Sequence, residues 1–278
     1  MIKEKFIKLK ERQEGALIAY ITGGDPSLKL TPLIADSLIS GGVDILEIGI
    51  PFSDPIADGP TIQLAVERAL KAGATPKKIL DLIGKIKKKN EETPIVILTY
   101  YNIIYKFGLK KFFKFASLNG VNGVIAADLP IEEADEYKRG AQKHHIDTIF
   151  LAAPSTPIKR LRIIAQASSG FLYLISTFGV TGVREKIQDL TVEFIKKALS
   201  TVNGKIPLAV GFGVSKPTHV KKFFSLGVDG VIVGSKFVKL IEENKTEREL
   251  LRKMEGFAFE LKKASKVKNV KGYLSMKE

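Results

Sequence analysis

The residues best suited to acid–base chemistry lie between positions 43 and 63, in the stretch VDILEIGIPFSDPIADGPTIQ. The stretch begins with an apolar run typical of a buried parallel strand, and Glu47 lies near the end of that run. A loop rich in proline and glycine follows and carries Asp58. A carboxylate in an apolar mouth has a raised pKa, which suits a general acid or base. The other interpretation is that Glu47 pairs with a basic residue and serves only the fold, and spacing alone leaves both open.

The same stretch resembles the signature of the tryptophan synthase alpha subunit family almost residue for residue, including the strings PFSDP and ADGPTIQ. The resemblance implies that Glu47 is the catalytic acid/base and that Asp58 is the second catalytic carboxylate. It also implies a carbon–carbon lyase of tryptophan biosynthesis, which cleaves indole-3-glycerol phosphate to indole and glyceraldehyde 3-phosphate. In that family the indole passes to a beta subunit that carries pyridoxal phosphate (PLP), so we expect no cofactor here and an alpha2beta2 assembly.

Short apolar runs alternate with segments of helical periodicity along the whole chain, which predicts an α/β protein. Eight such runs favour a closed (β/α)8 barrel, a TIM barrel, over a doubly wound open sheet, since no long crossover marks a switch point. We expect extra helices at both ends, before Gly15 and over about 247–266, and one domain over 1–278. The runs begin at Gly15, Val43, Pro94, Gly123, Asp147, Phe171, Pro207 and Asp229.

Glycine-rich loops follow the sixth, seventh and eighth of these runs, at 179–182, 211–213 and 234–235. Glycine lets the backbone N–H groups approach an anion, and loops after strands seven and eight commonly bind phosphate in this fold. We therefore predict a phosphate site, and no Walker or GxGxxG motif implies a nucleotide cofactor. The family resemblance assigns the phosphate contacts to Gly182, Gly211, Gly213, Gly234 and Ser235.

Aromatic and apolar residues near the strand ends could line an indole pocket, with core packing as the alternative. The resemblance also implies that Thr181 hydrogen-bonds the second carboxylate when its loop closes. Asp54 and Pro55 match a family loop that reports on the beta subunit, and the less favoured alternative is a local turn in which Asp54 hydrogen-bonds its own backbone before Pro55. The candidates for the pocket are Tyr20, Leu98, Tyr100, Tyr173 and Phe212.

Composition limits the other classes of function. The chain has 278 residues, a net charge of +14 and no cysteine, which excludes disulfides and thiolate metal sites. Its lysines are spread through helical segments, as on solvated helix faces, so we expect no nucleic-acid binding. We expect no membrane span and a cytoplasmic location, because no signal-peptide segment and no apolar run of about 18 residues is present. His144, His145 and His219 lack metal spacing and are expected to be surface or core residues, with no metal site.

Three alternatives remain open at this stage. A free-standing indole-releasing lyase would need no partner, and a non-catalytic regulatory subunit would not need both Glu47 and Asp58. Another phosphate-binding barrel, such as a sugar-phosphate isomerase, would not need the long motif at 43–63.

Overall fold

The structure is a computed structural model that describes residues 1–175, 189–211, 213–244 and 246–266. Within these residues, nine parallel strands form one sheet in the order β5-β4-β3-β2-β1-β9-β8-β7-β6. The strands coincide with the eight predicted apolar runs. They are β1 (Ala16–Thr22), β2 (Ile45–Gly49), β3 (Ile95–Thr99), β4 (Gly123–Ala126), β5 (Asp147–Thr148), β6 (Leu151–Ala152), β7 (Leu172–Ile175), β8 (Leu208–Gly211) and β9 (Gly230–Val233).

The sheet closes into a barrel because its two outermost strands, β5 and β6, belong to a single run of chain. β5 pairs with β4, and β6 pairs with β7. The two residues between them continue this bonding: the Ile149 N–H donates to the Val124 carbonyl, and the Phe150 carbonyl accepts from the Tyr173 N–H. The fifth barrel strand is therefore split in two. The predicted (β/α)8 barrel is confirmed, and the open doubly wound sheet is excluded.

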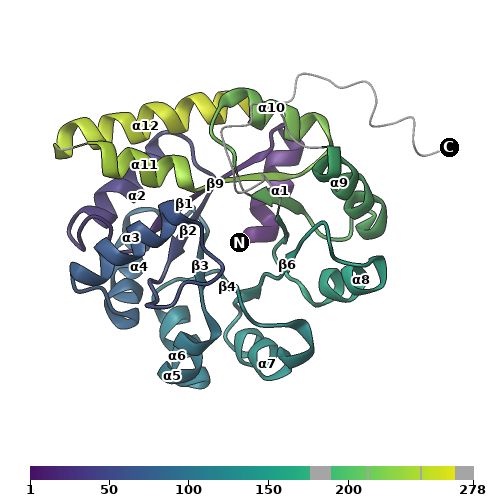
Figure 1. Cartoon of the computed structure of the whole chain (residues 1–278), viewed down its shortest axis with the longest axis horizontal. Coiled ribbons are helices and arrows are strands. Elements are labelled where there is room, and N and C mark those ends of the chain that lie inside the picture. Colours follow the sequence, from purple (N-terminus) through teal and green to yellow (C-terminus); the bar gives the residue numbers. More distant parts are fainter. Residues whose placement is uncertain (176–188, 212, 245, 267–278) are drawn as a thin grey trace.

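Helices surround the barrel (Figure 1). Three of them begin at a proline, Pro60, Pro76 and Pro217, whose missing N–H would have no partner in the first turn of a helix anyway. The helices are α1 (Ile2–Glu11), α2 (Leu30–Ser40), α3 (Pro60–Lys71), α4 (Pro76–Lys89), α5 (Tyr101–Phe107), α6 (Leu109–Leu118), α7 (Asp135–Lys143), α8 (Ile158–Ala167), α9 (Asp189–Val202), α10 (Pro217–Ser225), α11 (Ser235–Glu243) and α12 (Glu247–Ala264), with a 3-10 turn, η1 (Ile131–Glu133).

The predicted N-terminal helix closes one end of the barrel. α1 buries Ile2, Phe6 and Leu9 against the apolar side chains inside the barrel, and the rings of Phe6 and Phe171 lie 6.0 Å apart between centroids. Figure 1 shows α1 lying across the ring of strands. Because α1 fills this end, the opening of the barrel is at the other end, where the strands reach their carboxyl termini.

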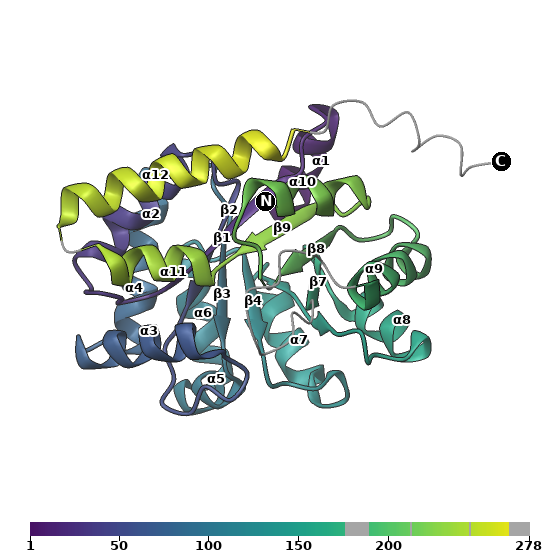
Figure 2. The same ribbon diagram turned by 45° about the horizontal axis from the view of Figure 1, so that its top comes forward.

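The predicted C-terminal helix, α12, packs along α2, α10 and α11 (Figure 2). Its Lys262 reaches the segment before β2 and lies 2.8 Å from a carboxylate oxygen of Asp44 and 3.0 Å from one of Glu14. This contact ties the last helix to the first two strands. Among the described residues, no helix is both long and apolar enough to cross a membrane.

Candidate active site

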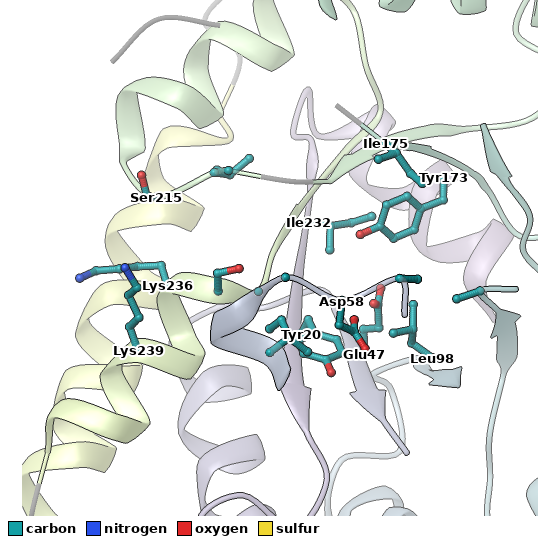
Figure 3. A pocket seen from close by; sticks show the side chains of 18 of the residues that line it. Tyr20, Glu47, Asp58, Leu98, Tyr173, Ile175, Ser215, Ile232, Lys236 and Lys239 are labelled. Atoms are coloured by element: carbon teal, nitrogen blue, oxygen red, sulfur yellow. The ribbon is translucent and has the colours of Figure 1, made fainter. Parts of the chain in front are cut away.

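A cavity of about 700 Å³ lies at the carboxyl ends of the strands, where barrel enzymes bind their substrates. Glu47 and Asp58 both line it, and Figure 3 shows their carboxylates close to one another. The motif stretch therefore supplies two acids to one cavity. A volume of this size fits a small-molecule ligand.

Glu47 points into the barrel because side chains alternate along β2. Leu46 and Ile48 pack in the layer between sheet and helices, whereas Ile45 faces the barrel interior, on the same side as Glu47. The Glu47 side chain is buried, and its Oε2 has no hydrogen-bond partner among the described residues. Burial, with a smaller contribution from the Asp58 charge, raises the pKa of Glu47 to about 8. Glu47 is thus protonated near neutral pH, and none of the described residues places a cation beside it.

Asp58 lies in the loop after β2 and is held by a tyrosine from β3's end. The Tyr100 hydroxyl donates to Asp58 Oδ2 at 2.9 Å, and the same hydroxyl accepts the Ala57 N–H at 2.9 Å. Burial raises the pKa of Asp58, and the Tyr100 hydrogen bond opposes the rise. Tyr100 itself does not line the cavity. Its hydroxyl contacts Asp58, and its ring is not part of the cavity wall.

Three of the predicted indole-pocket residues, Tyr20, Leu98 and Tyr173, line the cavity. Tyr20 pairs with Glu47 in the register of β1 and β2, which brings the phenol beside the carboxyl. Burial raises the pKa of both Tyr20 and Tyr173, so both remain neutral phenols.

Two glycines make room for these tyrosines. A Cβ at Gly49 would lie 2.4 Å from the Tyr20 hydroxyl, and a Cβ at Gly211 would lie 2.3 Å from the Tyr173 hydroxyl. Either contact is too close for any larger residue to be accommodated without movement. Gly211 does not line the cavity, and its contact with Tyr173 gives it a packing role beside the predicted phosphate role.

The predicted phosphate end is formed by Gly213, Gly234 and Ser235, which all line the cavity. Gly213 has a φ of +73°, a left-handed conformation that favours glycine. Ser235 begins α11, so the positive end of that helix faces the cavity. Three further predicted site residues lie outside the described residues: Gly182 of the phosphate group, Thr181 as the predicted partner of Asp58, and Phe212 of the indole pocket.

Sequence reasoning missed several residues at this end. Lys236 and Lys239 line the cavity beside Ser235, and the signal that could have found them is their spacing of three on a helix that starts at a phosphate loop. His219, which was expected to be a surface or core residue, is a further residue at this end. It lines the cavity with its side chain buried, and its Nδ1 accepts the Ser215 N–H at 3.4 Å.

Asp54 and Pro55 lie outside the cavity, on the loop between the two acids. Asp54 is exposed, and its carboxylate accepts the Ser53 hydroxyl at 2.6 Å. The neighbouring Ile56 has 84% of its surface exposed. The loop therefore presents a carboxylate and an apolar side chain outward while Asp58 faces inward.

The closed barrel and a cavity that holds two carboxyls and the N-terminus of a helix define a (β/α)8-barrel enzyme with acid–base chemistry. Comparison of the chain with known protein families narrows this class of enzyme. The family model for the tryptophan synthase alpha chain matches residues 6–266. The chain belongs to that family, and its reaction class is that of a carbon–carbon lyase.

Individual relatives agree with this assignment. The chain is 45% identical over 265 residues to the tryptophan synthase alpha chain of Methanosarcina barkeri, covering 95% of this chain and 97% of the relative. The fold matches the crystal structure of tryptophan synthase subunit alpha from Legionella pneumophila with a TM-score of 0.84 and 33% identity, over 95% and 97% of the two chains. A chain of Mycobacterium tuberculosis tryptophan synthase matches with a TM-score of 0.87 and 31% identity, over 96% and 98%.

Proposed function

We propose that Glu47 and Asp58 carry out the family's reaction in this chain, the retro-aldol cleavage of indole-3-glycerol phosphate to indole and glyceraldehyde 3-phosphate. The observation that carries the proposal is the unpartnered Glu47 carboxyl, with its pKa raised to about 8, in the same cavity as Asp58. A carboxyl that is protonated near neutral pH can donate a proton to carbon, which an ordinary glutamate cannot do under the same conditions.

The chemistry needs two proton transfers and a sink for electrons. Protonation of indole C3 by Glu47 turns the ring into an electron acceptor. Loss of the proton from the adjacent side-chain hydroxyl then breaks the carbon–carbon bond, forms the aldehyde carbonyl and returns the electron pair to the ring. Glu47, now a carboxylate, accepts that hydroxyl proton and returns to its starting state. Asp58 hydrogen-bonds the indole N–H and stabilises the positive charge that develops on the ring.

The two ends of the cavity suit the two ends of this substrate. Tyr20, Leu98 and Tyr173 would pack on the indole, and Tyr100 would hold Asp58 in place through its 2.9 Å hydrogen bond. At the opposite end, the glycine loops and the first residue of α11 would bind the phosphate. We extend this proposal to Gly182 and Gly211, which the family resemblance assigns to the phosphate, to Phe212 as an indole-pocket residue, and to Thr181 as a partner of Asp58 when its loop closes.

The chain's partner is proposed to be a tryptophan synthase beta subunit, in an alpha2beta2 assembly. The outward-facing loop with Asp54 and Pro55 supports this, since an exposed carboxylate beside an exposed Ile56 offers both charge and apolar area to a partner. A partner cation at Asp54 would bias the loop toward closure and speed the reaction. PLP would then bind only to the beta subunit, and this subunit would need no cofactor.

We also propose a cytoplasmic location and a single domain over 1–278. The second proposal is supported by the sheet, whose strands run from residue 16 to residue 233, and by α12, which packs on helices of the same barrel.

An indole-release assay tests the function. Wild type and Glu47→Gln are each assayed with indole-3-glycerol phosphate, with and without the beta subunit. We expect slow release by wild type alone, faster release with the beta subunit, and almost none by the variant. Retention of more than about a tenth of wild-type turnover by the variant would overturn the role of Glu47.

A second variant, Asp54→Ala, tests the partner. It should keep the slow basal rate and lose most of the acceleration by the beta subunit, equivalent to a coupling of about 1–3 kcal/mol. Equal acceleration of wild type and Asp54→Ala would show that Asp54 is only a turn residue.

A further inference from the structure

Three lysines, Lys216, Lys236 and Lys239, line the cavity, and the last two lie together on α11 beside Ser235. Lys236 and Lys239 lie three residues apart on α11, so they share one face of the helix. Among the described residues, neither ammonium group has a hydrogen-bond or ion-pair partner. Other lysines of the chain are paired, for example Lys262 with Asp44 and Lys77 with Asp81.

Lys236 and Lys239 lie next to the residues that are predicted to bind the substrate phosphate. They follow Gly234 and Ser235 directly, and all four residues line the cavity. In Figure 3, Lys236 and Lys239 lie at the end of the cavity away from Glu47 and Asp58, with Ser215 near them. Lys236 is half-buried and Lys239 is exposed. Glu243, the acid that also lines this end, makes no ion pair with Lys239.

Backbone N–H groups and a serine hydroxyl are neutral donors, which provide hydrogen bonds to a phosphate but no net charge. A phosphate monoester carries close to two negative charges at pH 8, because its second pKa is near 6. Two unpaired ammonium groups beside such donors supply a complementary charge of +2. They would also attract a charged substrate from solution, an effect that weakens as salt is added.

We propose that Lys236 and Lys239 form a cationic edge of the phosphate subsite, which selects a dianionic phosphate ester and speeds its capture. This inference rests on the proposed function for the identity of the substrate. The lysines bind and orient, and they lie at the opposite end of the cavity from the reacting carbon.

Steady-state indole release is the first test, using Lys236→Gln, Lys239→Gln and the double variant. We expect the double variant to raise KM about tenfold and leave kcat within about twofold, with the larger share from half-buried Lys236. The dependence of kcat/KM on ionic strength should flatten in the double variant. The matched control is Lys205→Gln, at an exposed lysine in the loop before β8, at the closed end of the barrel, which forms no ion pair with any residue that the structure describes. It should match wild type in every parameter.

A binding measurement separates this inference from the reaction itself. The affinities of glycerol 3-phosphate and glycerol 3-sulfate, a dianion and a monoanion of similar shape, are measured by calorimetry at pH 8. Wild type should prefer the phosphate ester, and the double variant should lose most of that preference. If wild type releases no indole yet shows this lysine-dependent preference, the reaction is wrongly assigned and the subsite stands. Unchanged KM, salt dependence and ester preference in the double variant would overturn the inference.

Discussion

Asp44 and Glu47 are two buried carboxylates only three residues apart, and they differ in whether other groups compensate their charge. Asp44 precedes β2 at the closed end of the barrel, where its Oδ2 accepts the Leu17 N–H at 2.8 Å and Lys262 Nζ at 2.8 Å. Glu47 lies within β2 and faces the cavity. No described residue bonds its Oε2, and the charge among them that acts on it is the like charge of Asp58. The two acids are therefore similarly buried, but only the charge of Asp44 is compensated by hydrogen bonds and an ion pair.

This difference distinguishes a carboxylate that stabilises the fold from one that is suited to catalysis. Burial raises the pKa of Asp44, while Lys262 and the Leu17 N–H act in the opposite direction and favour its charged form. Within the part of the chain that the structure describes, no group favours the charged form of Glu47, whose pKa rises to about 8. An uncompensated buried acid costs stability. The fold tolerates that cost where a proton donor is required, and it avoids the cost where only a link between helix and strand is needed.

The largest expected effect is that of Glu47→Gln on turnover. The amide keeps the volume of the side chain but cannot exchange a proton, and a general acid–base group contributes about 10²–10⁴ in rate. Because Glu47 serves two transfers, we expect a loss near 10⁴, measured as kcat for indole release. Asp44→Asn is the control for a buried acid on the same segment, and it should keep kcat within a few-fold of wild type.

The same substitution should have the opposite effect on stability. The unfolded chain loses the Glu47 proton near pH 4.5 and the folded chain near pH 8, so wild type loses stability as the pH rises through this window. Glu47→Gln has no such proton to lose. We expect it to exceed wild type by about 2–4 kcal/mol in urea unfolding at pH 8.5, and to match it more closely at pH 5. A variant less stable than wild type at pH 8.5 would contradict the comparison.

Asp58→Asn is expected to reduce kcat by about 10²–10³, because a neutral amide stabilises a cationic ring poorly. Tyr100→Phe should produce a smaller loss, since it removes only the hydrogen bond that holds the carboxylate. Asp54→Asn serves as the control on the same loop, and the comparison is made with the chain alone. Should Asp54→Asn be inactive while Asp58→Asn is near wild type, the wrong loop acid has been assigned.

The pH profile of kcat/KM should show both acids. Activity needs protonated Glu47, so it should fall about tenfold per pH unit above about 8. It also needs ionised Asp58, whose pKa is raised by burial, so activity should fall again on the acidic side. In Asp58→Asn the alkaline limb should move to lower pH, because the like charge beside Glu47 is gone. A profile that stays flat through pH 8–9 would exclude Glu47 as the proton donor.

The smallest expected effect is that of Asp44→Asn on stability. It removes the ion pair with Lys262, whose other partner, Glu14, remains. We expect a loss of about 1–3 kcal/mol in the free energy of unfolding. Asp81→Asn, which breaks an exposed pair with Lys77, should lose no more than about 0.5 kcal/mol. Equal losses in the two variants would show that Asp44 is not specially compensated.

The sequence predicts the barrel and the place of Glu47 because both follow from local patterns. Eight apolar runs give the strands, and alternation along β2 turns Glu47 inward. The hydrogen bond from Tyr100 to Asp58 spans 42 residues, and no local pattern encodes it. The division of the fifth barrel strand at Ile149 and Phe150 cannot be predicted from the sequence either, because both residues continue the apolar run. His219 and Lys236 reach the cavity through the placement of α10 and α11 on the barrel, which periodicity alone does not specify.

Titration of the Glu47 carboxyl tests the central claim most directly. The protein is labelled with ¹³C at its glutamate carboxyl groups, and the Glu47 signal is assigned by its absence in Glu47→Gln. The signal should titrate near pH 8, and its midpoint should fall in Asp58→Asn. A midpoint near 4.5, the ordinary value for glutamate, would show that Glu47 is compensated like Asp44 and that its proton is not held for catalysis.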